Sequence, residues 1–427
     1  MEEILFEKYK IATDNLNQYS VNLENFYKQF YVDRGQTSHI HDIVASLELN
    51  DHGRIKILFS GHRGSGKTTE LHNIERMLSK NGEFIVFFVQ SIQDGLDHHD
   101  IDYVDILVAI FTKILINIPK DLPIKNNLIE QLSSMLNKLG GEINRENKSM
   151  GQLNNLGNSF FSLLERRAQT KKGQNENNLD NSTLIGEIKH IFNDIITDLQ
   201  KKTGKKILII IDDLEKVTSP KIIESLFVDN YYLINKLECN FIFTIPISLK
   251  YSKRFENLRR AYTAEYTLPL FEVRKVNGEI NMMEVEIMGN IIQKRVPAEI
   301  IDKKSLYFAA ICSGGIVSDL LRLVSHSIIR ATTQHSKITP QIVSNVFNEE
   351  RTNTIRPLNE KDKKMIHEIH ATKRPIQKIQ EWIQLLYTSQ VLEYTDHSTG
   401  KLWYDVHPFV SPDTKELESI LSGISNF

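Results

Sequence analysis

The sequence has few cysteines and no long apolar run, and both shortages limit its class. Only Cys239 and Cys312 occur among its 427 residues, which excludes a disulfide framework and suits a reducing cytoplasm. The longest largely apolar stretch, residues 106–118, contains Lys113 and is too short to cross a bilayer. The N-terminal segment is too acidic for a signal peptide. We therefore expect a cytoplasmic protein without a membrane partner.

The sequence also lacks an excess of either charge. Its 52 Lys and Arg nearly balance 54 Asp and Glu, giving a formal net charge of −2 at pH 7, so no global field attracts nucleic acid. No Cys and His spacing fits a zinc site, and no Ser-His-Asp grouping points to a hydrolase triad. The apolar fraction is that of a soluble globular protein, and the length predicts roughly two or three domains.

The most informative segment begins with a short β-prone run at residues 55–59. The pattern G-x-x-x-x-G-K-T follows at residues 61–68, and a helix is expected from about Lys67. Glycine has no Cβ, so the backbone of such a loop can curl its N–H groups around phosphate oxygens. The residues expected to contact a nucleotide are Gly61, Arg63, Gly64, Ser65, Gly66, Lys67, Thr68 and Thr69.

The loop predicts ATP and Mg²⁺ as ligands. Lys67 would place its ammonium on the β- and γ-phosphates, as a catalytic charge, and the Thr68 hydroxyl would ligate the metal. The alternative is a glycine-rich turn that contains a lysine by chance, and the position between a strand and a helix disfavours it. His62 occupies an unspecified position of the pattern; it could reach a phosphate, but exposure to solvent is the simpler expectation.

A second informative segment is the aliphatic run at residues 207–211, which is followed by Asp212, Asp213 and Glu215. Such a run is typical of a parallel strand buried on both faces. Ligands bind at the carboxyl edge of such sheets. There Asp212 would hold Mg²⁺ through oxygen, and Asp213, helped by Glu215, would orient the attacking water as the catalytic carboxylate. An acidic turn after a strand is common by itself, but here it accompanies the phosphate loop.

Two other segments allow a nucleotide role beside a purely structural one. Thr244 is a polar residue near the end of the apolar strand expected at residues 241–246, where it could sense the γ-phosphate or simply favour β-structure. Tyr31, Val32 and Arg34 could line the adenine, with the first two as an apolar wall, or could pack as a strand or turn. Both alternatives stay open.

Composition describes two further regions. Residues 120–182 are rich in Asn, Gln, Lys, Gly and Ser, which favours helical insertions joined by a mobile loop. Arg254, Arg259 and Arg260 lie on one basic stretch. Most such charges solvate a helix face, but one of these arginines could instead reach the nucleotide of a neighbouring subunit.

The C-terminal region predicts two helices followed by a hairpin, with strands at about residues 391–394 and 402–406. This order is that of a winged helix, which could bind DNA through residues 361–407. The basic residues concerned are Lys373, Arg374 and Lys378. Alternatively the module packs on the core or on a partner, and the small number of basic residues favours this second interpretation.

These motifs together resemble the AAA+ superfamily, and within it the STAND-type and origin-recognition-like P-loop ATPases. Residues 61–69 look like the Walker A motif and residues 207–213 like the Walker B motif. The strand with Thr244 resembles the one that bears the first sensor, and residues 31–34 are similar to the Val-Gly-Arg box. The resemblance spans about residues 25–350.

The sequence departs from the AAA+ pattern in two places. Many members have Asp-Glu at the end of the Walker B motif. This chain has Asp212-Asp213 there, which is the STAND-like form. The double glycine in residues 312–322 looks like the second-sensor segment, but Ser318 occupies the usual arginine position, and Arg322 lies one helical turn further on. The resemblance implies that Arg322 could contact the nucleotide in its place.

The expected fold is α/β. It has a parallel-sheet P-loop NTPase core of the ASCE/AAA+ kind, then an α-helical lid and a winged-helix-like α+β domain. The expected boundaries are 1–30 for an N-terminal helical segment, 31–280 for the core, 281–350 for the lid and 351–427 for the last domain.

The function predicted from the sequence is that of an ATP-binding and ATP-hydrolysing molecular switch. It would control assembly with itself, as a homo-oligomer, or control a separately encoded effector protein. The resemblance implies that such an effector system could serve anti-phage defence. Two alternatives are a DNA-loading ATPase that uses the winged helix and a non-hydrolysing adaptor that keeps ATP as a structural ligand.

Overall fold

The structure is a computed structural model that describes residues 2–17, 23–118, 122, 124–142, 152–171, 181–217, 219–376 and 381–413. The chain separates into two compact units that interleave along the sequence. The sheet unit consists of His39–Ser60 and Thr68–Thr267, and the helical unit of Met1–Ser38, Gly61–Lys67 and Leu268–Phe427. The consecutive domain boundaries expected from the sequence stay predictions.

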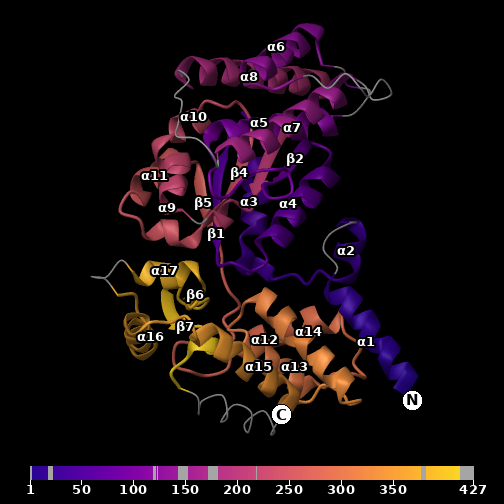
Figure 1. The fold of residues 1–427 in the computed structure, drawn as a ribbon, viewed down its shortest axis with the longest axis vertical. Coiled ribbons are helices and arrows are strands. Elements are labelled where there is room, and N and C mark those ends of the chain that lie inside the picture. Colours follow the sequence, from indigo (N-terminus) through magenta and orange to yellow (C-terminus); the bar gives the residue numbers. More distant parts are fainter. Residues whose placement is uncertain are drawn as a thin grey trace. The chain divides into compact units, whose positions relative to one another are not determined.

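The sheet unit is built on one five-stranded sheet with the order β2-β3-β4-β1-β5, visible in Figure 1. β2 pairs with β3, and β3 with β4, in parallel, which confirms the predicted P-loop NTPase fold class. The strands are β1 (Lys56–Gly61), β2 (Phe84–Gln90), β3 (Lys206–Asp212), β4 (Asn240–Pro246) and β5 (Ala264–Leu268).

The central strand β3 is apolar because both of its faces are covered. Successive side chains of a strand point to opposite faces, and Ile209 and Ile210 are both fully buried. Ile209 pairs with Phe87 of β2 and belongs with it to the large core cluster that includes helix α5 (Tyr103–Asn117). The run of aliphatic residues in the sequence is therefore explained, as expected, by burial of the strand on both faces of the sheet.

Helix α5 is the central helix of that core. Its N-terminus is a capping box, in which Asp102 accepts from the Asp105 N–H and Asp105 accepts from the Asp102 N–H. Almost every residue of α5 is buried, because it packs on both β2 and α7 (Gln152–Lys171). Arg167 of α7 binds the Asp105 carboxylate at 2.6 Å and that of Asp102 at 2.9 Å.

The remaining helices of the sheet unit include those in the region where an insertion was expected. The helices α6 and α7 lie in residues 120–182, where helical insertions joined by a mobile loop were expected; residues 143–151 and 172–180 lie outside the described residues, and the status of the region as an insertion stays a prediction. The elements are α3 (Ile40–Glu48), α4 (Lys67–Asn81), α6 (Asn126–Lys138), α8 (Asn181–Thr203), η2 (Leu214–Lys216), α9 (Pro220–Glu224), η3 (Ser225–Asp229), α10 (Tyr231–Asn235), η4 (Ile247–Tyr251) and α11 (Phe255–Ala261).

The helical unit has a second core, formed mainly by the helices that follow residue 281. Tyr9 and Ala12 of the N-terminal helix α1 are buried in this core. The helices predicted for the lid are present. The elements are α1 (Glu2–Leu16), α2 (Leu23–Gln29), η1 (Gly35–Ser38), α12 (Met282–Gln293), α13 (Lys303–Cys312), α14 (Val317–Thr333) and α15 (Pro340–Ile355).

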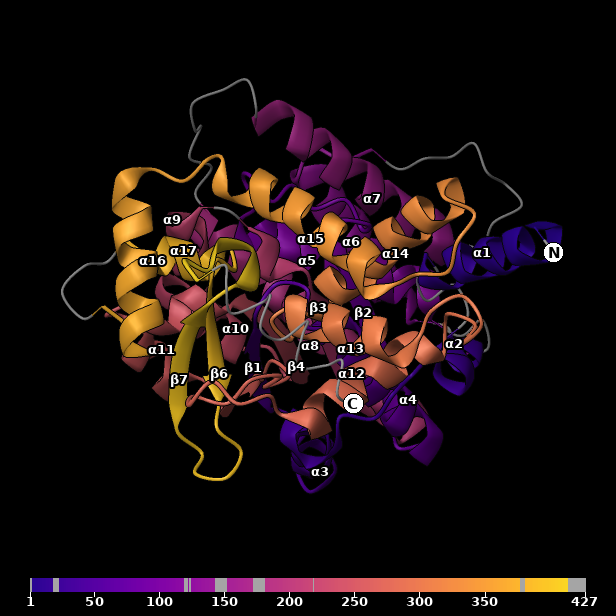
Figure 2. The same ribbon diagram turned by 90° about the horizontal axis from the view of Figure 1, so that it is seen from below.

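The C-terminal module belongs to the helical unit. It contains α16 (Glu360–Thr372), α17 (Trp382–Tyr387), the antiparallel strands β6 (Val391–Thr395) and β7 (Leu402–Val406), and η5 (Pro408–Val410). Figure 2 shows the hairpin beside α16 and α17. The predicted hairpin is confirmed, while its identity as a winged helix stays a prediction. Lys378 lies outside the described residues.

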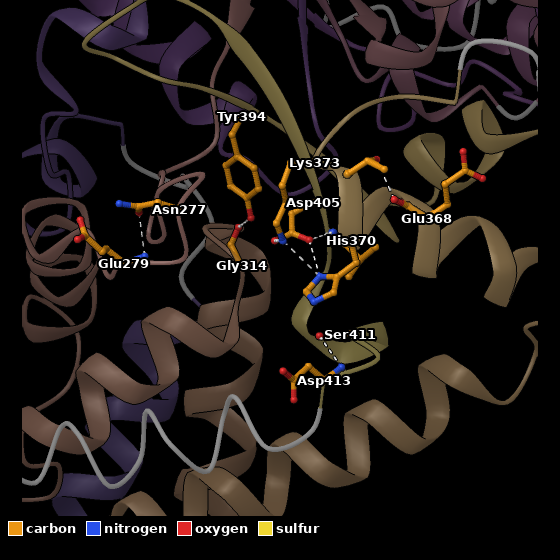
Figure 3. Close-up of polar contacts among 12 residues, drawn as sticks. Asn277, Glu279, Gly314, Glu368, His370, Lys373, Tyr394, Asp405, Ser411 and Asp413 are labelled. Atoms are coloured by element: carbon orange, nitrogen blue, oxygen red, sulfur yellow. Dashed lines mark hydrogen bonds and ion pairs between the residues drawn. The ribbon is translucent and has the colours of Figure 1, made fainter.

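Partly buried charged side chains join α16 to the hairpin. Asp405 of β7 contacts His370 at 2.8 Å and Lys373 at 2.6 Å, as Figure 3 shows. Burial acts to raise the pKa of Asp405, but the hydrogen bond to His370 and the charge of Lys373 outweigh it and lower the pKa.

Within the described residues, no helix is both long enough and apolar enough to cross a membrane.

Candidate nucleotide site

The loop at residues 61–67 requires glycine at Gly64 for two reasons. Its φ of +78° lies in the left-handed region, which side chains with a Cβ rarely adopt. A Cβ added there would also lie 2.0 Å from the Ser318 Oγ. Gly66 has a φ of +98° with nothing within 4 Å of an added Cβ. The loop thus has the curled backbone expected from its glycines, and helix α14 lies directly against it.

Two carbonyl groups of the loop are held by partners outside it. Ser318, at the start of α14, donates its N–H to the Gly64 carbonyl at 3.1 Å. Arg34 donates from Nη1 to the Ser65 carbonyl at 2.9 Å. The first N–H groups of a helix have no intrahelical partner, so the start of α4 at Lys67 offers donors to an anion.

Lys67 is buried, with 3% of its surface exposed. Its ammonium donates to the carbonyl oxygens of Gly61 at 3.2 Å and His62 at 3.0 Å. The lysine therefore lies over the loop rather than in solvent. In this position a phosphate oxygen can replace a carbonyl as the acceptor of its protons.

Arg34 lies behind the loop. It is buried, its guanidinium carbon lies 4.1 Å from the centre of the Phe271 ring, and it donates to the Ser65 and Pro269 carbonyls. The ring of Tyr31 packs on that of Tyr27 in a tilted arrangement, with 5.0 Å between ring centres. Val32 packs on the core of the helical unit. These contacts show the packing role of the segment, and its contact with adenine stays a prediction.

The expectation that His62 is exposed is wrong. Only 1% of its surface is accessible, and its Nε2 accepts a hydrogen bond from the backbone N–H of Glu393 in β6 at 2.8 Å. Burial, with smaller contributions from Lys67 and His407, lowers the pKa of His62 to about 3, so the imidazole is neutral and can accept. A backbone donor 331 residues away leaves no signal in the sequence.

The sheet unit gathers three carboxylates at the carboxyl end of β3. Asp212, Asp213 and Glu215 are buried, and their ligand atoms lie within 4.8 Å of one another. Burial raises the pKa of Asp212 to about 6, and the charges of Glu215 and Asp213 add to this, while the Thr68 hydroxyl acts in the opposite direction. The sequence predicted this cluster by its position after the strand.

The cluster fits a divalent cation. Asp212 is fully buried, and neither carboxylate oxygen accepts a hydrogen bond of usual geometry, although the Thr68 hydroxyl is near enough to lower the pKa. A buried carboxylate without donors is costly. A hard cation that prefers oxygen ligands removes this cost, so Asp212 and Thr68 are the residues that would hold Mg²⁺.

The turn after β3 is held by Thr244 and Lys216. Thr244 Oγ1, on β4, accepts from the Leu214 N–H at 3.1 Å. Asp213 has a φ of +71°, unusual for a residue with a Cβ, and its Oδ1 pairs with Lys216 at 2.6 Å. The contact of Thr244 is with this turn, and sensing of a γ-phosphate by Thr244 stays a prediction.

Sequence reasoning missed two residues beside the acidic turn. Ser91, directly after β2, donates its N–H to the Asp212 carbonyl at 3.3 Å. The Ser91 hydroxyl lies 2.8 Å from the Nε2 of His98. Burial lowers the pKa of His98, although the negative charge of Asp213 acts in the opposite direction and raises it. Neither residue belongs to a recognisable motif, so only the position of Ser91 at the end of β2 could have indicated it.

The arginines considered for a neighbouring subunit all have acidic partners in the sheet unit. Arg254 pairs with Asp229 and, at 3.6 Å, with Glu224. Arg259 and Arg260 lie 3.9 Å and 3.6 Å from the carboxylate of Glu256, on the same helix. The side chain of Arg260 is 79% exposed. A contact with another subunit stays a prediction for each of them.

Arg63, Ser318 and Arg322 line a common cavity of about 330 Å³ in the helical unit. The guanidinium of Arg322 is held by Asp319 at 3.0 Å and Glu350 at 3.4 Å. The structure thus brings Arg63 and Arg322, two residues predicted to bind the nucleotide, around one space beside the loop. Their contact with a nucleotide stays a prediction.

The parallel sheet, the curled loop before α4 and the acidic end of β3 define a P-loop NTPase domain. Residues 34–244 match the model of the KAP family P-loop domain. No curated protein matches the chain.

The chain is also similar, at low sequence identity, to solved structures that include the following three. The chain is 11% identical to a protein in the structure of Drosophila ORC bound to DNA, with a TM-score of 0.42 over 97% of this chain and 91% of the other. It is 12% identical to the Aeropyrum pernix ORC1 protein in complex with DNA, with a TM-score of 0.40 and 96% of each chain covered. It is 11% identical to a Walker-type ATPase of Pyrococcus abyssi, with a TM-score of 0.44 over 92% and 96%.

Proposed function

We propose that the chain binds ATP with Mg²⁺ and hydrolyses it. The observation that carries the proposal is the buried Asp212 carboxylate, which lacks well-formed hydrogen bonds and lies beside the Thr68 hydroxyl. Thr68 directly follows Lys67 in helix α4. One turn of helix thus supplies an ammonium for phosphate and a hydroxyl for a metal.

Each residue has a defined task in this proposal. Lys67 exchanges a loop carbonyl for a phosphate oxygen and balances the charge that develops on the leaving group. Thr68 and Asp212 would hold Mg²⁺, which would supply positive charge beside the phosphates. Asp213, fixed through Oδ1 by Lys216, orients a water molecule for in-line attack with the help of Glu215.

The result of hydrolysis in this proposal is a change in the helical unit. Gly64 of the loop contacts α14 through Ser318, so the occupant of the loop acts directly on the lid. Different contacts with ATP and ADP would shift the populations of lid positions. We propose that this switch controls self-assembly or a partner effector protein; native mass measurement with ATP, with ADP and without nucleotide tests whether assembly follows the nucleotide.

Calorimetry and phosphate release test the binding and the hydrolysis separately. The parent protein should bind Mg·ATP and release phosphate, and Lys67→Ala should abolish both because the loop loses its charge. Asp213→Asn should keep binding and lose turnover. Binding with no phosphate release from the parent would favour the non-hydrolysing adaptor, and no heat with Mg·ATP would contradict the whole proposal.

DNA binding by the C-terminal module is the second function predicted from the sequence, and the ion pairs of α16 weaken it. Lys361 pairs with Glu381 at 2.6 Å, Lys363 with Glu360 at 2.8 Å, and Lys373 with Asp405 at 2.6 Å. Cations with acidic partners attract phosphate less. A duplex-binding assay over a salt series decides, because binding to DNA backbone weakens steeply with salt.

A further inference from the structure

The outer edge of strand β6 reaches the phosphate loop within the helical unit. Glu393 stands opposite Tyr404 in the hairpin, but its N–H is directed away from β7 and donates to His62 Nε2 at 2.8 Å. Tyr404 shows the same pattern on the other edge, where its N–H donates to the Lys373 carbonyl at 3.1 Å. One amide on each outer edge of the hairpin thus has an acceptor in another part of the unit, and the loop provides one of these two acceptors.

A packed interface surrounds this hydrogen bond. The Tyr394 hydroxyl donates to the Gly314 carbonyl at 2.7 Å, and Figure 3 shows its ring directed at that glycine. Leu392 fits so closely that a Cβ on Gly314 would lie 2.9 Å from its methyl group. The apolar residues of the interface are Leu270, Ile316, Leu392, Tyr394 and Trp403.

The interface leads to the loop by two routes. Gly314 and Ile316 precede Ser318, which holds the Gly64 carbonyl. The direct route passes through His62 alone. Its side chain accepts from β6, and its carbonyl accepts from the Lys67 ammonium at 3.0 Å. A displacement of β6 therefore moves an anchor of the phosphate-binding lysine.

We propose that His62 is a positioning residue through which the C-terminal hairpin sets the shape of the phosphate loop. Nucleotide affinity then depends on whether the hairpin is in place. Because linkage is reciprocal, a bound nucleotide also strengthens the contact between His62 and β6. A partner that draws the hairpin away from the loop weakens nucleotide binding. This inference rests on the proposed binding of ATP.

Two substitutions of His62 separate the hydrogen bond from packing. His62→Leu fills similar space without an acceptor and leaves the Glu393 N–H buried and unsatisfied. His62→Gln keeps an acceptor oxygen near the position of Nε2. We expect Mg·ATP affinity, measured by calorimetry, to fall about tenfold in His62→Leu and to stay close to the parent value in His62→Gln.

Hydrogen exchange provides a readout that packing alone would not change. In the parent, exchange of the Glu393 amide should slow further when Mg·ATP is added. In His62→Leu this response should be lost while the thermal midpoint shows a folded protein. Glu393→Pro removes the same donor from an edge position, where proline is tolerated, and should weaken Mg·ATP binding as His62→Leu does.

Equal Mg·ATP affinity in the parent and His62→Leu would overturn the inference. So would equal impairment of His62→Leu and His62→Gln, since that result assigns the effect to packing. If His62→Leu does not fold, Glu393→Pro and the exchange response of the parent decide in the same way. Failure of the proposed function is distinguishable, because the parent itself would then give no heat with Mg·ATP.

Discussion

Arg34 donates from Nη1 to the carbonyl oxygen of Ser65 at 2.9 Å, and from Nη2 to the carbonyl of Pro269. One buried side chain therefore joins the segment before η1, the phosphate loop and the chain after β5. Its planar fork suits this arrangement, because two donors lie in fixed positions. The ring of Phe271 covers the guanidinium and excludes water from it.

Replacing this arginine tests how much the loop depends on it. Arg34→Met should lower the free energy of unfolding by about 2–3 kcal/mol, because buried acceptors of a charged donor lose their partner. Mg·ATP affinity should fall with it. Arg34→Lys should recover only part of both, since one ammonium does not reproduce the fork. Chemical denaturation and calorimetry measure the two effects.

The matched control is Arg260→Ala, which removes an arginine whose side chain is 79% exposed. Its effect on the free energy of unfolding should stay within about 0.5 kcal/mol. If Arg34→Met is equally mild, the loop does not need the contact between Arg34 and Ser65.

Asp212→Asn should stabilise the protein in the absence of metal. The pKa of this carboxyl is raised from its ordinary 3.8 to about 6. Ionisation of the group above pH 6 therefore lowers the free energy of unfolding by about 3 kcal/mol. The amide removes that cost, so the free energy of unfolding at pH 8 should rise by about 1–3 kcal/mol. The gain should disappear as the pH falls toward 4, where the parent carboxyl is protonated.

The same substitution should remove the stabilisation that Mg·ATP gives the parent, because a divalent cation loses its charged ligand. Denaturation with and without Mg·ATP measures both effects. Asp51→Asn, at a side chain that is 94% exposed, serves as the control and should change neither. A destabilised Asp212→Asn protein would show that the acidic cluster is paired more fully than its contacts indicate.

Asp405 should have the opposite dependence on pH. Its pKa is lowered in the fold, so its contribution to stability is fully present above the ordinary range of aspartate and is lost as the pH falls through the lowered value. Asp405→Asn should cost about 1–2 kcal/mol at pH 7, because Lys373 and His370 lose a partly buried, hydrogen-bonded partner.

The difference in unfolding free energy between the parent and Asp405→Asn should shrink as the pH falls from 5 to 3. Urea denaturation at a series of pH values measures it. A difference that stays constant over this range would contradict an ionised Asp405 in the folded protein.

The sequence predicted those parts of the molecule that depend on local pattern. The strand at β3 could be read because a strand buried on both faces needs an unbroken aliphatic run. The loop could be read because glycine spacing follows from the backbone geometry around phosphate. The predicted strands, lid helices and hairpin are present, while the roles of the site residues stay predictions.

The contacts between distant parts could not be predicted. The acceptor of the Glu393 N–H is His62, 331 residues away, and a backbone donor is the same for every residue type except proline. The contact between Arg34 and Ser65 is also to a backbone atom. The sequence therefore predicts candidate phosphate-binding residues more readily than it shows which residues hold the loop in shape.

Gly64 allows the strain of the loop to be separated from its contact with α14. Gly64→Ala places a Cβ 2.0 Å from Ser318 Oγ at a φ of +78°, whereas Gly35→Ala meets only a φ of +72° with nothing within 4 Å. Gly35→Ala should therefore cost about 1 kcal/mol of unfolding free energy. Gly64→Ala should cost clearly more, since α14 must shift or the loop must open.

The double variant Gly64→Ala with Ser318→Gly removes the colliding hydroxyl and its Cβ but keeps the positive φ. Its cost should fall below the sum of the two single substitutions, because the residues share one contact. Mg·ATP affinity should follow the same order, since an opened loop no longer presents its N–H groups to phosphate. Urea denaturation and calorimetry of the four proteins measure this coupling. Additive costs would mean that the loop and α14 do not press on each other, and that the lid does not respond directly to what the loop holds.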